Sequence, residues 1–258
     1  MTWKTISNES YHNEFTTYLS STDIRRILRS PAHFRAPRAP ATQAQEFGTL
    51  VHEAVLEPET WSACRRPSPK IDKRTKEGKA LAEWQLGQEL ELGIKFVSED
   101  IYEQVCKIAE TVHTSLGSSG ILTGGVAELS GFCELNEQPI RVRPDYMTDE
   151  TIIDLKTTQD CRDFSKSAFN WGYDVQASLY CSAAKAIDGK ERRFLWVVVE
   201  KEPPYGVQVY EASAEVLARG QSLYEKAIEV YKGCAALDYW PSYSTTIQTL
   251  NLPKWLKE

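Results

Sequence analysis

Residues 143–156 read Arg143-Pro-Asp-Tyr-Met-Thr-Asp-Glu-Thr-Ile-Ile-Asp-Leu-Lys156. A polar turn around residues 148–150 followed by an apolar, β-branched run predicts a β-hairpin. Side chains alternate along a strand, so Asp154 and Lys156 point to the same face of its second strand. Asp145, near the end of the first strand, can lie opposite them. The hairpin therefore gathers two carboxylates and a lysine.

Two interpretations of this hairpin follow from its residues alone. A carboxylate placed beside an apolar strand is costly unless it is paired or binds a metal, which favours a metal site. A surface hairpin that carries an Asp–Lys ion pair is the structural alternative. The rest of the chain has to decide between them.

The composition favours one large domain with its own core. The chain has 258 residues, of which 41% are apolar, enough for a single core with a helical extension. No apolar run approaches the ~20 residues that cross a bilayer, and the N-terminus lacks the apolar core of a signal peptide. We therefore expect a soluble, cytoplasmic protein. The six cysteines are scattered and never form Cys-x-x-Cys, which argues against a zinc site or a disulfide framework.

The net charge of -6 does not resemble the basic footprint of most nucleic-acid-binding proteins. The cations are unevenly distributed, however, and they concentrate in residues 25–38 and 65–79. This distribution fits a basic channel in an acidic body. Solvated helix faces would give the same pattern.

Periodicity divides the chain into helices and strands. Residues 1–20 are expected to be irregular. Helices are expected at 21–28, 45–57, 81–90, 99–116, 163–188 and 214–232, with Ser21 or Thr22 as the first N-cap. Strands are expected at 127–135, 139–146, 151–157, 193–200 and 206–211. The first three strands are predicted to form an antiparallel meander, and 193–200 is apolar enough to be a buried central strand.

Further polar side chains lie at informative places on these elements. His52 follows Gly48 by one helical turn, and it is either a satisfied core histidine or a ligand. Gln176 and Tyr180 are four residues apart, so they share one face of a helix. Glu128 begins the first strand, from which it could reach the same end of the sheet as Asp145.

Taken in order, these motifs resemble the RecB-like branch of the PD-(D/E)xK nuclease superfamily. They are most similar to the exodeoxyribonuclease VIII (RecE-type) nuclease domain. The segments that carry the resemblance are Ser20-Ser-Thr-Asp-Ile-Arg-Arg26, Ser30-Pro-Ala-His-Phe34, Gly48-Thr-Leu-Val-His-Glu-Ala-Val-Leu-Glu-Pro-Glu59, Lys73-Arg-Thr-Lys-Glu-Gly-Lys79, Arg141-Val-Arg-Pro-Asp145, Ile153-Asp-Leu-Lys-Thr-Thr158, Val175-Gln-Ala-Ser-Leu-Tyr180 and Leu252-Pro-Lys-Trp255.

The resemblance implies an α/β (α+β) fold with a restriction-endonuclease-like core, in which a mixed central β-sheet is flanked by helices. One domain would span 1–258, with a helical part at about 20–120 and a nuclease core at about 125–235. The implied activity is Mg²⁺-dependent 5′-to-3′ degradation of double-stranded DNA ends, which leaves 3′ single-stranded tails. The implied partners are a RecT-type single-strand annealing protein and further copies of the chain in a ring, in a bacterial or phage setting.

The resemblance also assigns roles to residues. Asp145, Asp154 and the Leu155 backbone carbonyl would bind Mg²⁺, with Mn²⁺ as a substitute, because hard oxygen ligands suit these ions. His52 and Glu128 would complete or orient the metal site. Lys156 would orient or deprotonate the attacking water. Gln176 and Tyr180 would hold the nucleophile or the DNA backbone. The resemblance also implies that DNA phosphates are bound by Lys73, Arg74 and Lys76.

Two other functions stay open. One is a related PD-(D/E)xK endonuclease, although the clustered cysteines of its iron–sulfur members are absent. The other is a catalytically inert scaffold that binds DNA ends or the annealing partner. The intact set of two acids and a lysine argues against the scaffold.

Overall fold

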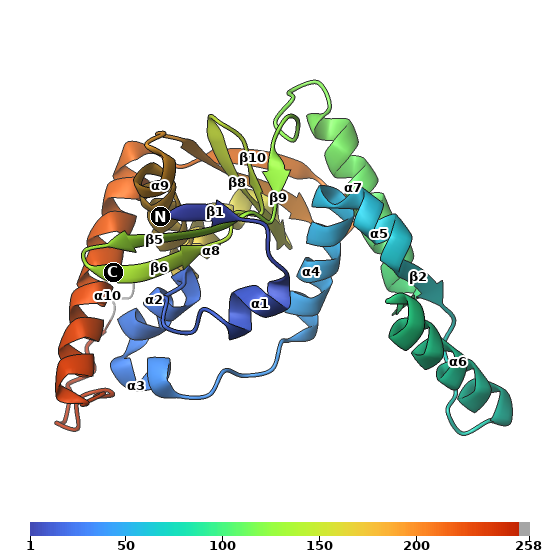
Figure 1. The fold of residues 1–258 in the computed structure, drawn as a ribbon, viewed down its shortest axis with the longest axis horizontal. Coiled ribbons are helices and arrows are strands. Elements are labelled where there is room, and N and C mark those ends of the chain that lie inside the picture. Colours follow the sequence, from blue (N-terminus) through green and yellow to red (C-terminus); the bar gives the residue numbers. More distant parts are fainter. Residues whose placement is uncertain (253–258) are drawn as a thin grey trace.

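The computed structural model describes residues 1–252 (Figure 1). Residues 253–255 of the segment Leu252–Trp255 lie outside this range. The helices are α1 Asn8–Asn13, α2 Ser21–Arg29, α3 Pro31–Arg35, α4 Gln43–Leu56, α5 Pro58–Cys64, α6 Lys76–Leu92, α7 Glu99–Leu116, α8 Phe164–Asn170, α9 Tyr173–Asp188 and α10 Ala214–Leu237. The strands are β1 Thr2–Lys4, β2 Arg65–Ser68, β3 Lys95–Ser98, β4 Val126–Ala127, β5 Ser130–Leu135, β6 Gln138–Val142, β7 Tyr146–Met147, β8 Thr151–Thr158, β9 Arg193–Glu200 and β10 Val207–Glu211.

A mixed five-stranded sheet forms the centre, in the order β10-β9-β8-β7-β4. Strands β8 and β9 are parallel and the other pairs are antiparallel. Strand β9 is buried along nearly its whole length, as its continuous apolar sequence predicts. The predicted mixed sheet flanked by helices is confirmed.

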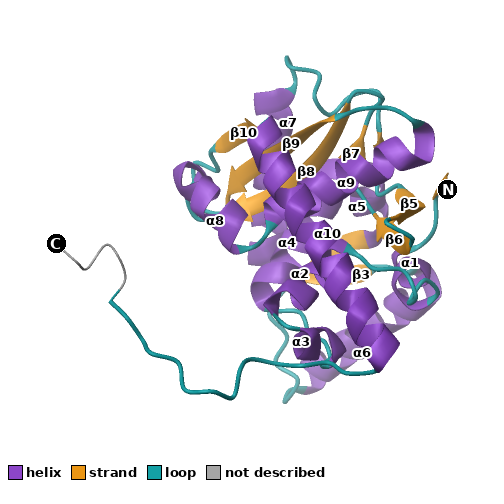
Figure 2. Ribbon diagram, turned by 90° about the vertical axis from the view of Figure 1, so that its left-hand side faces the viewer, coloured by secondary structure: helices purple, strands orange, loops and turns teal. Residues whose placement is uncertain are grey.

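Helices cover both faces of this sheet (Figures 1 and 2). On one face, side chains such as Ile152 and Trp196 join α2, α9 and α10 in one apolar cluster. On the other face, Ile153 and Leu155 pack with α4 and α7 in a second cluster. The alternation along β8 therefore turns Asp154 and Lys156 toward the side of α9, as the two-residue period requires.

The predicted three-stranded meander is wrong in its connectivity. Strands β5 and β6 belong to a separate sheet with the order β1-β5-β6, and only the two-residue β7 pairs with β8. The chain passes from one sheet to the other at Arg143 and Pro144, which lie outside both strands. Proline has no N–H to give to a ladder, so the strand pairing ends there.

The N-terminal segment is more ordered than its sequence predicts. Strand β1 pairs along β5, and α1 has Ser7 as its N-cap. The N-cap of α2 is Ser20 and not Ser21 or Thr22, because Ser20 and Asp23 form a capping box, which satisfies two free backbone N–H groups. Helices α6 and α10 are longer than predicted, and the helix predicted at 163–188 is divided into α8 and α9. The predicted helices at 45–57 and 99–116 and the predicted strands at 151–157, 193–200 and 206–211 lie close to their observed bounds.

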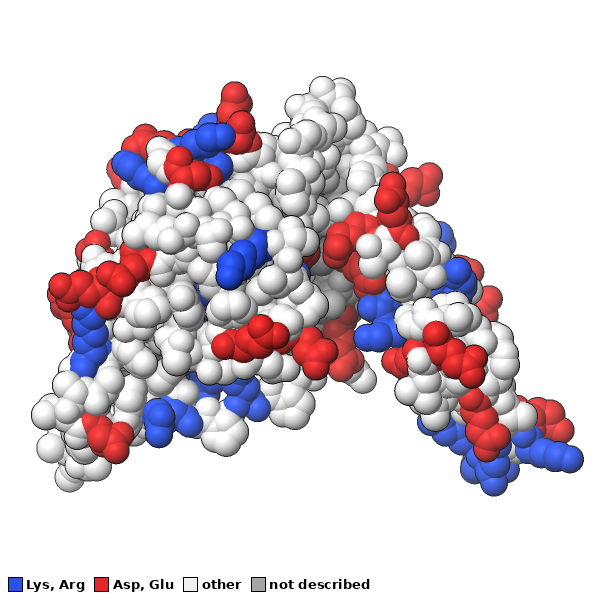
Figure 3. All heavy atoms as spheres, in the orientation of Figure 1, with Lys and Arg blue, Asp and Glu red and all other residues white. Residues whose placement is uncertain are grey.

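Helix α6, β2 and β3 form an arm that projects from the body (Figure 1). The parallel pair β2–β3 joins it to α5 and α7. Figure 3 shows Lys and Arg side chains gathered at its free end. Within residues 1–252, no helix combines the length and the apolar character that a membrane span requires.

Candidate active site

The site forms where β8 has a free edge. Strand β7 pairs with β8 only at Ile152 and Ile153, so the backbone of Leu155 is available to side chains. Its N–H donates to Oδ2 of Asp145 at 2.8 Å. Its carbonyl oxygen lies 2.7 Å from Nε2 of His52. The early end of β7 thus lets side chains from two distant segments bind the backbone N–H and carbonyl of one residue.

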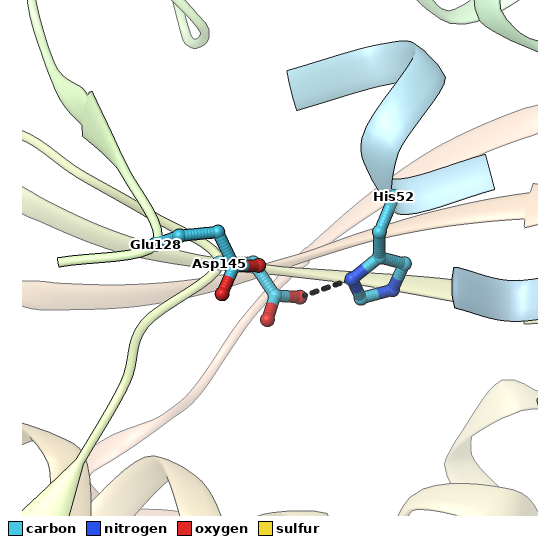
Figure 4. Close-up of side chains that lie close together, drawn as sticks. All are labelled: His52, Glu128 and Asp145. Atoms are coloured by element: carbon cyan, nitrogen blue, oxygen red, sulfur yellow. Dashed lines mark ion pairs between the residues drawn. The ribbon is translucent and has the colours of Figure 1, made fainter. Parts of the chain in front are cut away.

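His52, Glu128 and Asp145 converge at this edge (Figure 4). Their potential ligand atoms all lie within 4.8 Å of one another. They come from α4, from the link between β4 and β5, and from the link between β6 and β7. Nδ1 of His52 lies 3.4 Å from Oδ2 of Asp145. Three predicted site residues from different parts of the chain therefore meet.

Asp154 and Lys156 form a second, buried group on the neighbouring face of β8. Asp154 is 1% exposed. Its Oδ2 forms an ion pair with Nζ of Lys156, and its Oδ1 accepts a hydrogen bond from Nε2 of Gln176 at 2.8 Å. Nζ of Lys156 also lies 4.9 Å from the centroid of the Tyr173 ring. Helix α9 therefore holds this group through both Gln176 and Tyr173.

Two electrostatic effects act on this buried group. Burial raises the pKa of Asp154 and outweighs the opposing effect of Lys156, while Asp145 adds to the rise. Burial alone would lower the pKa of Lys156, but the carboxylates of Asp154 and Asp145 reverse that effect and raise it. Lys156 is therefore an ammonium ion at neutral pH.

Tyr180 lies one turn after Gln176 and is 7% exposed. Its pKa is raised, first by burial and then by the charges of Asp145 and Asp154. The hydroxyl is therefore neutral and remains a hydrogen-bond donor beside two acids. Gln176 contacts Asp154 directly, while the role of Tyr180 at the nucleophile or the DNA backbone stays a prediction.

Glu128 carries the clearest sign of excess negative charge. Burial and then the Asp145 carboxylate raise its pKa to about 7, against the opposing effect of Arg143 and His52. Nε of Arg143 donates to Oε2 of Glu128 at 2.7 Å. Nη1 of Arg143 is buried and has no hydrogen-bond partner among the described residues. Arg143 therefore compensates the negative charge of Glu128 and Asp145 only in part.

This donor set fits a divalent cation. In a neutral imidazole whose Nε2–H donates to the Leu155 carbonyl, Nδ1 holds a lone pair that faces the Asp145 carboxylate. Two acceptors that face each other repel unless a cation lies between them. Carboxylates with one imidazole suit Mg²⁺ or Mn²⁺. Among residues 1–252, the residues placed to hold the ion are His52, Glu128 and Asp145.

The structure separates some predicted ligands from this group. Asp154 lies outside the three-residue cluster, since its two oxygens face Lys156 and Gln176. The Leu155 carbonyl faces His52 in this conformation. Both remain predicted ligands of a metal-bound state.

The basic residues predicted to bind DNA do not meet the acidic site. Lys73 and Arg74 precede α6 and Lys76 begins it, at the projecting arm. Arg74 is paired with Asp72 at 2.9 Å. Their position on the arm is away from the carboxylates (Figure 1). A role for them in DNA binding stays a prediction.

Three side chains at the site escaped the sequence analysis. Arg143 lies within the Arg-Pro-Asp motif, so its pairing with Glu128 could have been proposed from proximity to Asp145. Tyr173 precedes Gln176 by three residues, one helical turn. Tyr11 gave no signal, although the guanidinium of Arg143 lies 5.4 Å from the centroid of its ring. Only the folded chain brings α1 to this place.

Comparison with known proteins places the chain in a family. Residues 20–253 match the sequence model of a family described as "PDDEXK-like domain of unknown function (DUF3799)". No curated protein matches the chain.

A solved structure shares the fold at low sequence identity. A protein from Eubacterium rectale, described as a candidate exonuclease, is 13% identical with a TM-score of 0.63, over 89% of this chain and 88% of its own. A phage-related exonuclease from Haemophilus somnus is 13% identical with a TM-score of 0.32, over 88% of this chain and 98% of its own. The first likeness supports the fold.

Proposed function

Since the chain belongs to the PDDEXK-like family DUF3799, we propose that it is a metal-dependent exodeoxyribonuclease. It degrades linear double-stranded DNA from 5′ ends and leaves 3′ single-stranded tails for strand annealing. The observation that carries this proposal is the junction of two groups at one edge of β8. The cluster of His52, Glu128 and Asp145 lies beside the buried set of Asp154, Lys156 and Gln176.

The side chains divide the work of phosphodiester hydrolysis. Lys156 is charged, so it orients the attacking water and stabilises the negative charge that develops on the phosphate. Gln176 fixes Asp154 by a hydrogen bond, and the neutral hydroxyl of Tyr180 is a donor for the nucleophile or for a phosphate oxygen. The free Nη1 of Arg143 is a second donor at the same edge.

His52, Glu128 and Asp145 would hold the cation, with Asp154 beside them. A bound Mg²⁺ supplies a more acidic water and neutralises charge on the phosphate. Thermal unfolding tests this binding without any DNA, because a ligand that binds only the folded state stabilises it. At 100 times Kd the gain is about 2.7 kcal/mol. Mg²⁺ or Mn²⁺ should raise the Tm of the wild type but not of Asp145→Asn.

Digestion of linear duplex DNA labelled separately at each 5′ and 3′ end tests the activity. Mg²⁺-dependent loss of the 5′ labels is expected, with 3′ single strands left behind and with no loss in EDTA. A covalently closed circle is the control and should stay intact. Cutting of the circle would identify an endonuclease. Tight binding of ends without cleavage would identify an inert scaffold.

The assembly is part of the proposal. We infer that identical chains form a ring whose lysine and arginine side chains face the DNA. A single-strand annealing protein is the inferred partner. The net charge of -6 combined with locally concentrated cations supports a polarised assembly. Light scattering after size-exclusion chromatography tests it, and a monomer at working concentration would refute the ring.

A further inference from the structure

A hollow of about 380 Å³ lies on the face built by α2, α8, α9 and α10, which Figure 2 shows together. Four cations line it: Arg25, Arg29, Arg219 and Lys226. The one carboxylate among its lining residues belongs to Asp174. That carboxylate is buried and ion-paired with Arg219, so the hollow presents positive charge in a chain whose net charge is -6.

Two aromatic side chains stand exposed in the same hollow. Phe169 is 46% exposed and Trp171 is 65% exposed. Single exposed apolar residues are ordinary, but these two lie among the four cations. Aromatic faces interleaved with cations are the composition of a site for single-stranded nucleic acid, where bases stack on the rings and phosphates meet the charges.

The protein fixes the backbone at Trp171 and contacts the ring of Phe169. Nη1 of Arg25 donates to the carbonyl of Trp171 at 2.9 Å, and the guanidinium of Arg219 lies 5.4 Å from the centroid of the Phe169 ring. Gly172 turns the chain directly after Trp171 with a φ of 66°, a conformation that favours glycine. The rings are therefore presented on a fixed turn, which lowers the entropy lost on binding.

The hollow adjoins the candidate active site. Trp171 is two residues before Tyr173, whose ring centroid lies 4.9 Å from Nζ of Lys156. The same helix then supplies Gln176 to Asp154. A strand that leaves the acidic site along the start of α9 would thus approach Trp171.

We propose that this hollow binds unpaired nucleotides of single-stranded DNA next to the active site. Stacking requires an accessible base face, which a paired and stacked duplex does not offer. The hollow therefore distinguishes the unpaired strand of a partly digested end from the intact duplex. This inference deepens the proposed nuclease function, but the binding step itself can be measured without catalysis.

The test measures binding of fluorescent (dT)20 by anisotropy in EDTA, with the full chain. Trp171→Ala should weaken binding roughly tenfold, and Trp171→Ala with Phe169→Ala roughly 100-fold, given the typical contribution of each stacked base. Trp171→Phe should restore most of the affinity. Binding of a blunt duplex of the same length should change less than about twofold.

Trp84→Ala is the matched control, because Trp84 is an exposed tryptophan (55%) on the arm. It should leave (dT)20 affinity unchanged. Lys226→Ala should make the slope of log binding constant against log salt concentration shallower by roughly 0.7. This is the amount expected for the loss of one phosphate contact on a single strand. Thermal unfolding of each variant checks that the fold is retained.

Unchanged (dT)20 affinity in the double variant would overturn the inference, and so would an equal loss in Trp84→Ala. Preferential binding of an acidic protein over (dT)20 through the same rings would overturn it as well. End-labelled digestion in Mg²⁺ separates the two proposals. Binding through Trp171 without cleavage refutes the nuclease and supports the hollow, while cleavage with unchanged binding in Trp171→Ala refutes the hollow alone.

Discussion

The packing of α10 on α9 positions the candidate catalytic side chain of Gln176, and Gly220 permits this packing. A Cβ added at Gly220 would lie 2.2 Å from the carbonyl oxygen of Asp174 and 2.8 Å from Cβ of Ser178. The Asp174 carbonyl is part of the helix backbone and cannot rotate away as a side chain can. The two helices would therefore have to separate by about 1 Å to reach ordinary van der Waals contact. Gly233, further along the same helix, has open space around it.

The two glycines therefore predict opposite effects of the same substitution. In a helix interior, alanine is favoured over glycine by about 1 kcal/mol, and Gly233→Ala should gain this amount. Gly220→Ala should gain the same propensity but lose about 3 kcal/mol to overpacking, a net loss of about 2 kcal/mol. The two variants should thus differ by about 3 kcal/mol in the free energy of unfolding, or roughly 6–10 °C in Tm.

The same pair of variants connects packing to activity. Asp174 and Gln176 lie on one helix, so a displaced α9 would disturb the 2.8 Å hydrogen bond from Gln176 to Asp154. A misplacement of about 1 Å can lower a catalytic rate roughly 100-fold. Urea unfolding and end-labelled digestion measure the two effects. If Gly220→Ala proved as stable and active as Gly233→Ala, the helix contact described here would be incorrect.

Four further substitutions test the site and its support. Asp145→Asn should lower Mg²⁺-dependent digestion by at least about 100-fold, because it removes a charged ligand from the cation site; circular dichroism should show the fold retained. Lys156→Met should lower kcat by about 100- to 1,000-fold with little change in DNA binding, since it removes a donor to the developing charge; equal kcat would refute that role. Gln176→Leu should cost about 1–3 kcal/mol in urea unfolding, because Oδ1 of buried Asp154 loses its donor. Hydrogen bonds from Arg192 outweigh the opposing effect of burial and hold the pKa of Asp188 at about 2. The stabilisation that Asp188 contributes is complete above about pH 5 and is lost as the pH falls toward 2. Solvent screens this partly exposed pair, so Asp188→Asn should cost about 1 kcal/mol at pH 7 and flatten this acid-dependent loss.

Local patterns predicted the parts of the site that depend on one segment. Alternation along residues 151–156 placed Asp154 and Lys156 on one face, and four-residue spacing placed Gln176 and Tyr180 on one helix face. The continuous apolar run at 193–200 predicted the central strand β9. These inferences succeed because the period of a strand or helix is a property of the local backbone.

The remaining parts depend on contacts that no local pattern specifies. The hairpin prediction missed the change of sheet at Pro144, because strand periodicity does not say which strand is the neighbour. Tyr11 meets Arg143 across more than a hundred residues. The basic loop before α6 looked like a DNA-binding segment of the site, yet the fold carries it out on the arm. Tertiary packing decided each of these.

The site carries more negative charge than its neighbouring cations compensate, and this excess bears on its function. Glu128 and Asp145 meet at one edge of β8, with Asp154 on the neighbouring face, and Arg143 and Lys156 compensate these acids only in part. The pKa of Glu128 is raised to about 7 and that of Asp154 is also raised, so the folded chain disfavours the charged form of both acids. Apolar side chains of similar size would make a more stable edge. An acidic cluster kept at a cost in stability, beside a half-buried ammonium and a strand edge open to side chains, is what a cation-dependent attack on a phosphate requires.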